Sequence, residues 1–366
     1  MKANIQALRF PAGKRILCVS DIHGNLPYLK GLLEQANFSG DDELVIVGDL
    51  LEKGPDSLAT LRFVMELCEQ GNVHVISGNC DDWYDVVDDH SPELEEALRR
   101  YLSFRPGGLI GQMCAACGFS IDPPVDVAAL REAIAAPFQK EFDFLRSLPH
   151  IIETPHYTFV HGGLPKGDPD GWTAWNCMKY DHFMTCGRRF DKWVVCGHWP
   201  VMLYHEDIVD ANPVIDRESR IISIDGGCVL KDDGQLNALV IPQDGSEEFS
   251  HIAYDPFPKA TVLQAQAPSG KSWYIRWGDA KVQVLERGAE FCRCRHLRTG
   301  YEMNILTKYV YGEGEACEVN DCTDYVLPLS PGDEVSVVES TSRGYFVKHK
   351  GISGWYFGAL EPVPTI

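Results

Sequence analysis

The chain contains no long hydrophobic run. Nowhere in its 366 residues does a stretch approach the ~18 consecutive apolar residues of a membrane-spanning helix. No apolar run follows Lys2 at the N-terminus, so the sequence predicts no secretory signal peptide. We therefore expect a protein without a membrane partner.

Basic residues and regularly spaced cysteines are also scarce. The 33 Lys and Arg face 53 Asp and Glu, a formal net charge of −20. Binding nucleic acid through its phosphates needs a basic face, so we expect no nucleic-acid partner.

The 13 cysteines are odd in number and lack the regular spacing of a disulfide framework. Cys114 and Cys117 are spaced like metal ligands, but no second such pair follows. We interpret them as reduced thiols, which predicts a cytoplasmic protein.

What the chain does have is apolar content of 45% and a length that suggests two or three domains. Short apolar runs alternate with helical patterns, which is typical of βαβ units with a parallel sheet. Residues 83–147 read as a mostly helical insertion. The apolar runs that predict two sheets lie at 15–20, 44–47, 73–76, 158–160, 193–196 and 221–224.

After about residue 250 the pattern changes to short strand-like runs and frequent turns. Segment 278–306 echoes segment 332–360 at an offset of 53 to 54 residues, which predicts two copies of a small all-β unit. The second copy resembles a Src-homology-3-like barrel, and the first does so more weakly. An aromatic groove for a peptide partner is one interpretation; we favour Trp355 and Tyr356 as barrel core. The predicted domains are 1–250, 251–311 and 312–366.

Carboxylates, imidazoles and one amide follow the apolar runs, where parallel sheets collect their ligands. Such side chains suit hard divalent and trivalent cations. Asp49 can donate one oxygen to each of two metals, and a hydroxide bridging such a pair attacks phosphoesters in line. The candidate metal ligands are Asp21, His23, Asp49, Asn79, His161 and His198.

These motifs make residues 15 to about 242 similar to the calcineurin-like metallophosphoesterases, and within them to the bacterial phosphoprotein phosphatase branch. The strings that carry the resemblance include VSDIHGNLPYL, VGDLLEKGPDS, SGNCDD, FVHGGLP and VVCGHWPV. The resemblance implies an α/β fold, a four-layer α/β/β/α sandwich, followed here by the two small β-barrels. It also implies the six ligands above around two ions. Manganese, iron or zinc would suit them, and we expect manganese to support activity in vitro.

Three residues depart from the family pattern. Cys80 stands where the family has a histidine that is thought to protonate the leaving oxygen. Glu52 stands where the family has an aspartate that supports this histidine. Lys53 stands where the family has an arginine that clamps the phosphate. A lysine cannot make the bidentate contact of an arginine. The candidate catalytic residues are therefore Cys80, Glu52 and Asp81, and the candidate phosphate contacts are Lys53, Asn79 and Lys179.

The leading functional interpretation is a phosphomonoesterase acting on a phosphorylated small molecule or a phosphoprotein. An alternative is hydrolysis of a dinucleoside polyphosphate or a cyclic nucleotide. We rank it lower because Trp199 and Pro200 follow His198, where phosphodiesterases usually carry a second histidine two residues on. A non-catalytic scaffold with peptide-binding barrels is the third interpretation.

Overall fold

The computed structural model describes residues 1–242, 246–312 and 316–362. It divides into two compact units. The N-terminal unit comprises Met1–Trp199, Pro213–Leu230 and Leu236–Tyr254; the C-terminal unit comprises Pro200–Asn212, Lys231–Gln235 and the chain from Asp255 onward. Each is described by itself.

A five-stranded sheet in the N-terminal unit has the order β12-β11-β2-β3-β4. Strands β2, β3 and β4 are parallel, and β11 pairs antiparallel with β2 and β12. The parallel strands are mostly apolar, as is typical where both faces of a sheet are covered. Their bounds are β2 Arg15–Val19, β3 Asp42–Val47, β4 Val73–Ile76, β11 Leu236–Ile241 and β12 Ser250–Tyr254.

A six-stranded sheet has the order β1-β5-β6-β7-β10-β9. Strands β6, β7 and β10 run parallel, so their carboxyl ends share one edge, as those of β2, β3 and β4 do. The bounds are β1 Ile5–Ala7, β5 Ile151–Glu153, β6 Tyr157–Val160, β7 Trp193–Cys196, β9 Val214–Asp216 and β10 Ile221–Ser223.

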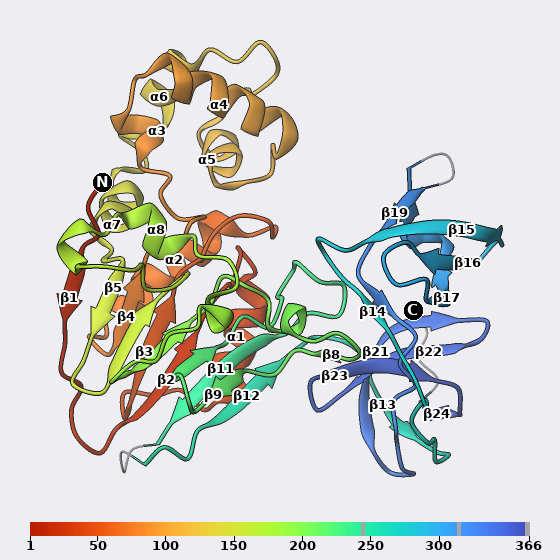
Figure 1. Ribbon diagram of the computed structural model, residues 1–366. Helices are drawn as coiled ribbons and strands as arrows, with labels where there is room; N and C mark the ends of the chain where they lie inside the picture. The colour runs from red at the N-terminus through yellow and green to blue at the C-terminus, as the bar shows by residue number, and fades with distance from the viewer. Residues whose placement is uncertain (243–245, 313–315, 363–366) are drawn as a thin grey trace. The chain divides into compact units, whose positions relative to one another are not determined.

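The two sheets pack face to face, and helices cover their outer faces (Figure 1). The core between the sheets joins residues such as Val45 and Phe159. A second core lies between the five-stranded sheet and α1 and α2, and a third lies against the outer face of the six-stranded sheet, under α8 and η2. The four-layer α/β/β/α prediction is confirmed. The helix bounds are α1 Leu26–Gln35, α2 Ser57–Cys68, α8 Ala174–Met178, η1 Pro169–Gly171 and η2 Phe183–Thr185.

The predicted insertion is helical and connects β4 to β5. Its helices α3 to α6 lie together beyond the sheets in Figure 1. Arg131 of α6 is buried and donates to the carbonyls of Val86 and Asp89 and to Glu95, which holds α3, α4 and α6 together. The bounds are α3 Asp85–Asp88, α4 Pro92–Phe104, α5 Leu109–Cys117, α6 Val127–Ala135 and α7 Gln139–Ser147.

In its described residues, the C-terminal unit is all-β apart from two short 3-10 turns, η3 Val201–Tyr204 and η4 Thr307–Tyr309. Its larger sheets have the orders β17-β16-β15-β19-β18 and β24-β13-β21-β22-β23-β8, and β14 pairs with β20. The bounds are β8 Val209–Asp210, β13 Lys259–Val262, β14 Tyr274–Ile275, β15 Lys281–Arg287, β16 Phe291–His296, β17 Glu302–Leu306, β18 Val310–Tyr311, β19 Cys317–Val319, β20 Cys322–Thr323, β21 Glu334–Thr341, β22 Gly344–His349, β23 Ile352–Tyr356 and β24 Leu360–Glu361.

The sequence repeat corresponds to two antiparallel meanders, β15-β16-β17 and β21-β22-β23. Each has a bulge in its first strand, between Val284 and Glu286 and again between Val337 and Glu339, at the repeat's own offset. Trp355 and Tyr356 are buried, as the core interpretation requires. The Src-homology-3-like assignment and the peptide partner stay predictions.

The predicted boundaries at residues 250 and 311 also stay predictions, and the strand pairing divides this region differently. Strand β12 closes the N-terminal unit at Tyr254, and β13 pairs with β21 and β24 of the second meander's sheet. Residues 313–315 and 363–366 of the third predicted domain lie outside the described residues.

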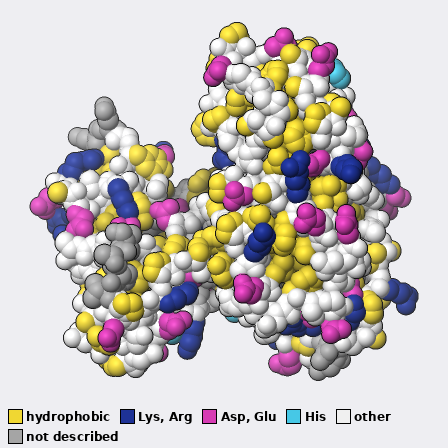
Figure 2. All heavy atoms as spheres, turned by 180° about the vertical axis from the view of Figure 1, so that it is seen from behind, with side chains coloured by type: hydrophobic (Ala, Val, Ile, Leu, Met, Phe, Trp, Pro, Cys, Tyr) yellow, Lys and Arg dark blue, Asp and Glu magenta, His cyan; other side chains and the backbone are white. Residues whose placement is uncertain are grey.

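Within the described ranges, no helix combines the length and the apolar character that crossing a bilayer would demand. On the face shown in Figure 2, Lys and Arg side chains lie scattered among Asp and Glu and do not gather in one field. Local pairing of opposite charges therefore accompanies the net negative charge of the chain.

His150, which precedes β5, makes stability depend on pH. Its Nδ1 accepts a hydrogen bond from the Asn4 N–H at 2.9 Å, and burial lowers the pKa of His150 below its ordinary value. The folded state thus prefers the neutral ring, and this contribution is lost as pH falls below about 6.5, where the unfolded chain takes up the proton. In His150→Asn the amide oxygen can accept the same bond without titrating.

We expect the melting temperature of His150→Asn to fall less than that of wild type between about pH 7.5 and pH 5.5. Thermal unfolding followed by circular dichroism measures this, with exposed His90→Asn as the control. Equal slopes in wild type and His150→Asn would contradict the assignment.

Candidate metal centre

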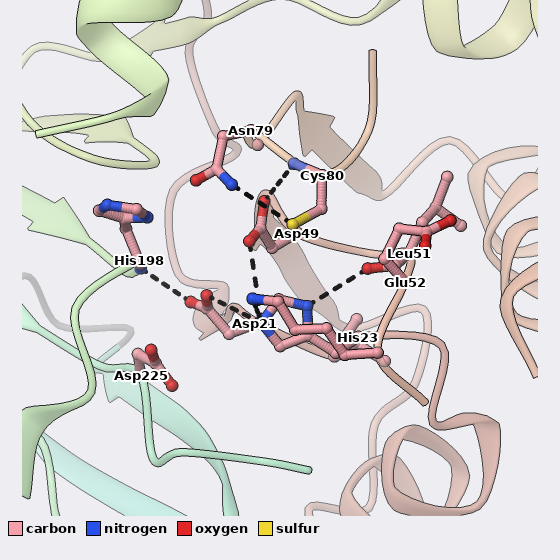
Figure 3. Close-up of polar contacts among 12 residues, drawn as sticks. Asp21, His23, Asp49, Leu51, Glu52, Asn79, Cys80, His198 and Asp225 are labelled. Atoms are coloured by element: carbon pink, nitrogen blue, oxygen red, sulfur yellow. Dashed lines mark hydrogen bonds and ion pairs between the residues drawn. The ribbon is translucent and has the colours of Figure 1, made fainter. Parts of the chain in front are cut away.

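The six predicted ligands come from the carboxyl ends of strands in both sheets. Asp21, Asp49 and Asn79 follow β2, β3 and β4, while His161 and His198 follow β6 and β7. Because the strands in each group are parallel neighbours, the ligands meet at one edge of the sandwich. Figure 3 shows Asp21, His23, Asp49 and Asn79 directed toward one another, with His198 to one side.

The backbone at the site is strained. Eleven described non-glycine residues have a positive φ, and six of them lie here: Asp21 (56°), His23 (52°), Asp49 (52°), Glu52 (70°), Lys53 (67°) and His198 (67°). Such conformations cost free energy and persist only where the surroundings enforce them, and they cluster at functional sites. Gly48 contributes a close approach as well: at its φ of 80°, a Cβ atom would lie 2.7 Å from His161 Nδ1.

Asp49 is the centre of the arrangement. Its Oδ1 lies 3.2 Å from His161 Nε2, and its Oδ2 lies 3.8 Å from His23 Nε2. The two oxygens thus face different imidazoles, as a carboxylate shared between two cations would. Asp21 Oδ1 lies 3.7 Å from the same His23 nitrogen.

Backbone carbonyls fix which nitrogen each imidazole presents. His161 Nδ1 lies 2.8 Å from the Val47 carbonyl, and His23 Nδ1 lies 3.2 Å from the Leu51 carbonyl. A carbonyl only accepts, so each Nδ1 carries the proton and each Nε2 turns its lone pair to the site. This is the outer support that metal-binding histidines usually have.

Three ligand atoms are buried without a hydrogen-bond partner: Asp21 Oδ1, Asn79 Oδ1 and His161 Nε2. Buried polar atoms are rarely left so, and a bound ion is one explanation. Two donor triplets, His23-Asp49-Cys80 and Asp21-Asp49-His161, each have their ligand atoms within 4.8 Å of one another, and they share Asp49. The residues therefore fit cations, and the carboxylate and imidazole donors fit manganese, iron or zinc.

The carboxylates at the site favour positive charge beside them, whereas burial opposes it. Burial raises the pKa of Asp21 to about 6. Although burial lowers the pKa of His161, the Asp49 and Asp21 carboxylates raise it to about 10. Burial, with Lys53 nearby, lowers the pKa of His23 to about 3. The carboxylates thus stabilise a cation between them, whether a proton or a metal.

His198 is held differently from the other ligands. Its backbone N–H donates to Asp21 Oδ2 at 3.0 Å, while its ring Nε2 lies 2.8 Å from Asp181 Oδ1 and 3.1 Å from Lys179 Nζ. Its ring lies 5.3 Å from that of His161. Lys179, the predicted clamp, therefore reaches the site, paired with Asp181, a residue that the sequence analysis missed because no periodic pattern surrounds it.

Cys80 and Lys53 also reach the site. The Cys80 N–H donates to Asp49 Oδ1 at 2.9 Å, and its Sγ accepts from Asn79 Nδ2 at 3.3 Å. Burial raises the pKa of the Cys80 thiol well above its ordinary value, so it stays protonated. Lys53 Nζ lies 3.2 Å from His23 Nε2. Partial burial lowers the pKa of Lys53, but the nearby Asp49 and Asp21 carboxylates outweigh this and raise it.

Glu52 and Asp81 lie elsewhere than expected for partners of position 80. Asp81 accepts from the N–H groups of Gly78 at 2.8 Å and Leu51 at 3.2 Å, so it braces two ligand loops. Glu52 accepts from the Leu109 N–H at 2.9 Å and from the Tyr101 hydroxyl. None of its hydrogen bonds among the described residues leads to Cys80. A glutamate is one methylene longer than the family's aspartate, and it reaches the insertion.

Asp225 is a site residue that the sequence analysis did not select. It follows β10, and Figure 3 places it beside Asp21. It is fully buried, its Oδ2 has no hydrogen-bond partner, and burial, followed by the Asp21 charge, raises its pKa well above the ordinary value. Its position after the sixth apolar run, like the ligands after the others, could have revealed it.

Comparison with known proteins agrees with this geometry. Residues 14–215 match the model of the calcineurin-like phosphoesterase family, more than half of the chain. The chain belongs to this family. The predicted family is thereby confirmed, and with it a metal-dependent phosphoric ester hydrolase.

The similar curated proteins are named bis(5'-nucleosyl)-tetraphosphatase, symmetrical. The relative from Photobacterium profundum is 48% identical over 259 residues, covering 58% of this chain and 89% of that protein. The Vibrio campbellii relative is 48% identical over 164 residues, covering 44% and 48%. The Pectobacterium atrosepticum relative is 47% identical over 64 residues, covering 17% and 22%. The last two matches span about half and about a fifth of the relatives' own lengths.

Solved structures show looser likenesses. A metallophosphoesterase from Sphaerobacter thermophilus has 18% identity and a TM-score of 0.38, covering 66% of this chain and 88% of that chain. A protein serine/threonine phosphatase from Saccharomyces cerevisiae has 10% identity and a TM-score of 0.42, covering 70% and 84%.

Replacing Asp49 by asparagine should weaken metal binding at this family's centre. The amide oxygen can keep the bond from the Cys80 N–H, so the loop should fold, but the negative charge shared by His23 and His161 is lost. We expect metal content after incubation with manganese to fall from about two ions per chain to below one. Elemental analysis of the purified protein measures this, with exposed Asp41→Asn as the control. A full complement of metal in Asp49→Asn would contradict this role.

Proposed function

We propose that this enzyme hydrolyses the phosphoanhydride chain of a dinucleoside polyphosphate, releasing nucleoside diphosphates. The observation that carries the proposal is Cys80 at the position of the family's leaving-group acid. The names of the curated relatives support it. They favour the alternative interpretation of the sequence over the phosphomonoesterase that we ranked first.

The leaving group explains why a thiol suffices. The pKa of the Cys80 thiol is well above its ordinary value, which makes it a weak proton donor at neutral pH. A serine or sugar alkoxide needs a proton as it leaves. A nucleoside diphosphate leaves as an anion whose conjugate acid has a pKa of about 6, so it needs little help. A site with a weak acid therefore suits an anhydride better than an alkyl ester.

The chain offers cationic groups for the polyphosphate on both sides of the ligand cluster. The Lys53 ammonium lies beside His23, and the Lys179 ammonium lies beside His198. Asn79, whose Nδ2 lies 3.3 Å from Cys80 Sγ, adds an amide. Each lysine acts as a point charge, which suits a flexible chain of phosphates better than one fixed bidentate phosphate.

The Asp21, His23, Asp49, Asn79, His161 and His198 side chains would hold the cations. When bound, the cations would supply Lewis acidity to the phosphate and would lower the pKa of a water molecule. The chain's own part is to orient the phosphates through Lys53 and Lys179. Asp181 keeps the His198 ring in place at 2.8 Å, and the Val47 and Leu51 carbonyls do the same for His161 and His23.

A substrate panel tests the proposal. With manganese present, we expect kcat/KM for diadenosine tetraphosphate to exceed that for phosphoserine and for cyclic nucleotides by about a hundredfold or more, with ADP as the only nucleotide product. Chromatography of the products measures both. Faster hydrolysis of phosphoserine, or release of ATP with AMP, would contradict it.

The role of position 80 is tested by Cys80→His. An imidazole with a pKa of about 6.5 can donate a proton near neutral pH. We expect the rate on phosphoserine to rise about tenfold or more, while the rate on diadenosine tetraphosphate changes little. Cys80→Ser, which lacks a good acid, is the matched control. Equal effects on the two substrates would contradict this account of the leaving group.

A further inference from the structure

Tyr101 of α4 touches two of the three ligand loops of the five-stranded sheet, those that follow β3 and β4. Its hydroxyl donates to a carboxylate oxygen of Glu52, in the loop that follows Asp49. Its ring centroid lies 4.4 Å from that of Trp83, four residues after Asn79. One side chain of the insertion thus packs against the loops that carry two of the ligands.

The second Glu52 oxygen caps the next helix of the insertion. Helix α5 begins at Leu109 with no side-chain cap of its own, and the Leu109 N–H donates to Glu52 Oε1 at 2.9 Å. A carboxylate at a helix N-terminus satisfies a free N–H and the positive end of the dipole. The fit is close: a Cβ atom on Gly108 would lie 1.7 Å from the Tyr101 hydroxyl oxygen and 2.6 Å from Glu52 Oε2, so any larger residue there would displace these side chains.

On its other side, Glu52 adjoins two groups of the site. Its neighbour Leu51 supplies the carbonyl that holds His23 Nδ1 at 3.2 Å, and its neighbour Lys53 places its ammonium 3.2 Å from His23 Nε2. Glu52 and Lys53 both have left-handed backbone, with φ of 70° and 67°. A loop in this conformation needs external contacts to stay there, and the insertion provides them.

We propose that Glu52 and Tyr101 are positioning residues that fasten the helical insertion to the active site and thereby set the places of Lys53 and His23. The insertion is then a working part of the site. This inference rests on the proposed hydrolase function, since it assigns Lys53 to the substrate phosphates.

Two substitutions break the link and one conserves it. Glu52→Ala removes both bonds, and Tyr101→Phe removes only the hydroxyl. Glu52→Gln keeps an oxygen for the Leu109 N–H and an amide that can donate to the Tyr101 oxygen.

With diadenosine tetraphosphate and bis(p-nitrophenyl) phosphate as substrates, we expect kcat/KM to fall about tenfold to a hundredfold in Glu52→Ala and about threefold to tenfold in Tyr101→Phe. Inhibition by inorganic phosphate should weaken in parallel, and Glu52→Gln should stay within about threefold of wild type.

Gln112→Ala is the matched control, because it should loosen α5 without displacing the loop that carries Lys53. Gln112 of α5 accepts from the Leu58 N–H at 2.9 Å and donates to the Pro55 carbonyl at 3.0 Å. It therefore ties the same helix to residues 55–58, which follow the ligand loop, and not to the loop itself. We expect its kcat/KM to stay within about twofold of wild type. Amide hydrogen exchange should rise at residues 49–54 in Glu52→Ala and Tyr101→Phe but not in Gln112→Ala.

Wild-type kcat/KM in Glu52→Ala or Tyr101→Phe, or an equal loss in Gln112→Ala, would overturn the inference. A lower melting temperature with unchanged phosphate inhibition would also overturn it, because it would show a purely structural role. If the wild type hydrolyses neither substrate, the proposed function fails, whereas the exchange at residues 49–54 still decides whether Glu52 and Tyr101 hold the loop.

Discussion

The buried Asp49 carboxylate is the constraint on which the site depends. One oxygen faces His161 from the six-stranded sheet and the other faces His23 from the five-stranded sheet, so a single side chain joins both halves of the sandwich. A buried carboxylate is costly unless it is paired. Here the compensation comes from two imidazoles, the Cys80 N–H and any bound cation. The arrangement therefore favours occupancy by positive charge.

The two sheets supply the rigidity that this requires. The core between them packs strands β2, β3 and β4 against β6, β7 and β10, which fixes the two edges where the ligand loops emerge. Those loops hold six residues in left-handed backbone, a conformation that would relax on a less rigid support. The hydrophobic layers thus stabilise a strained polar site that local sequence preference alone would not form.

Much of the fold and several of the site residues were predictable from the sequence. The other features depend on long-range contacts that local sequence patterns do not reveal. Asp21, Asp49 and Asn79 follow buried apolar runs, so strand patterning alone places them at one edge. Asp181 gives no such indication, because it comes from an irregular loop and meets His198 only in the folded chain. The partners of Glu52 depend on the path of an insertion that begins at residue 83. The pairing of β13 with the second meander is likewise a long-range choice that no local pattern encodes.

The departures at positions 52 and 80 then have one explanation. In a site with a histidine acid, a carboxylate beside it orients the imidazole and supports its charge. A neutral thiol at position 80 has no need of that carboxylate, which is free to bond elsewhere. The longer Glu52 side chain carries its charge to the N-terminus of α5 and to Tyr101, where both oxygens find donors. In the proposed function, loss of the acid would restrict the chemistry to leaving groups that are already acidic. Through Tyr101 and Leu109, the Glu52 carboxylate connects α4 and α5 to the loop that follows Asp49. In this proposal, the weak proton donor Cys80 and the attachment of the insertion through Glu52 are therefore two results of one altered subsite.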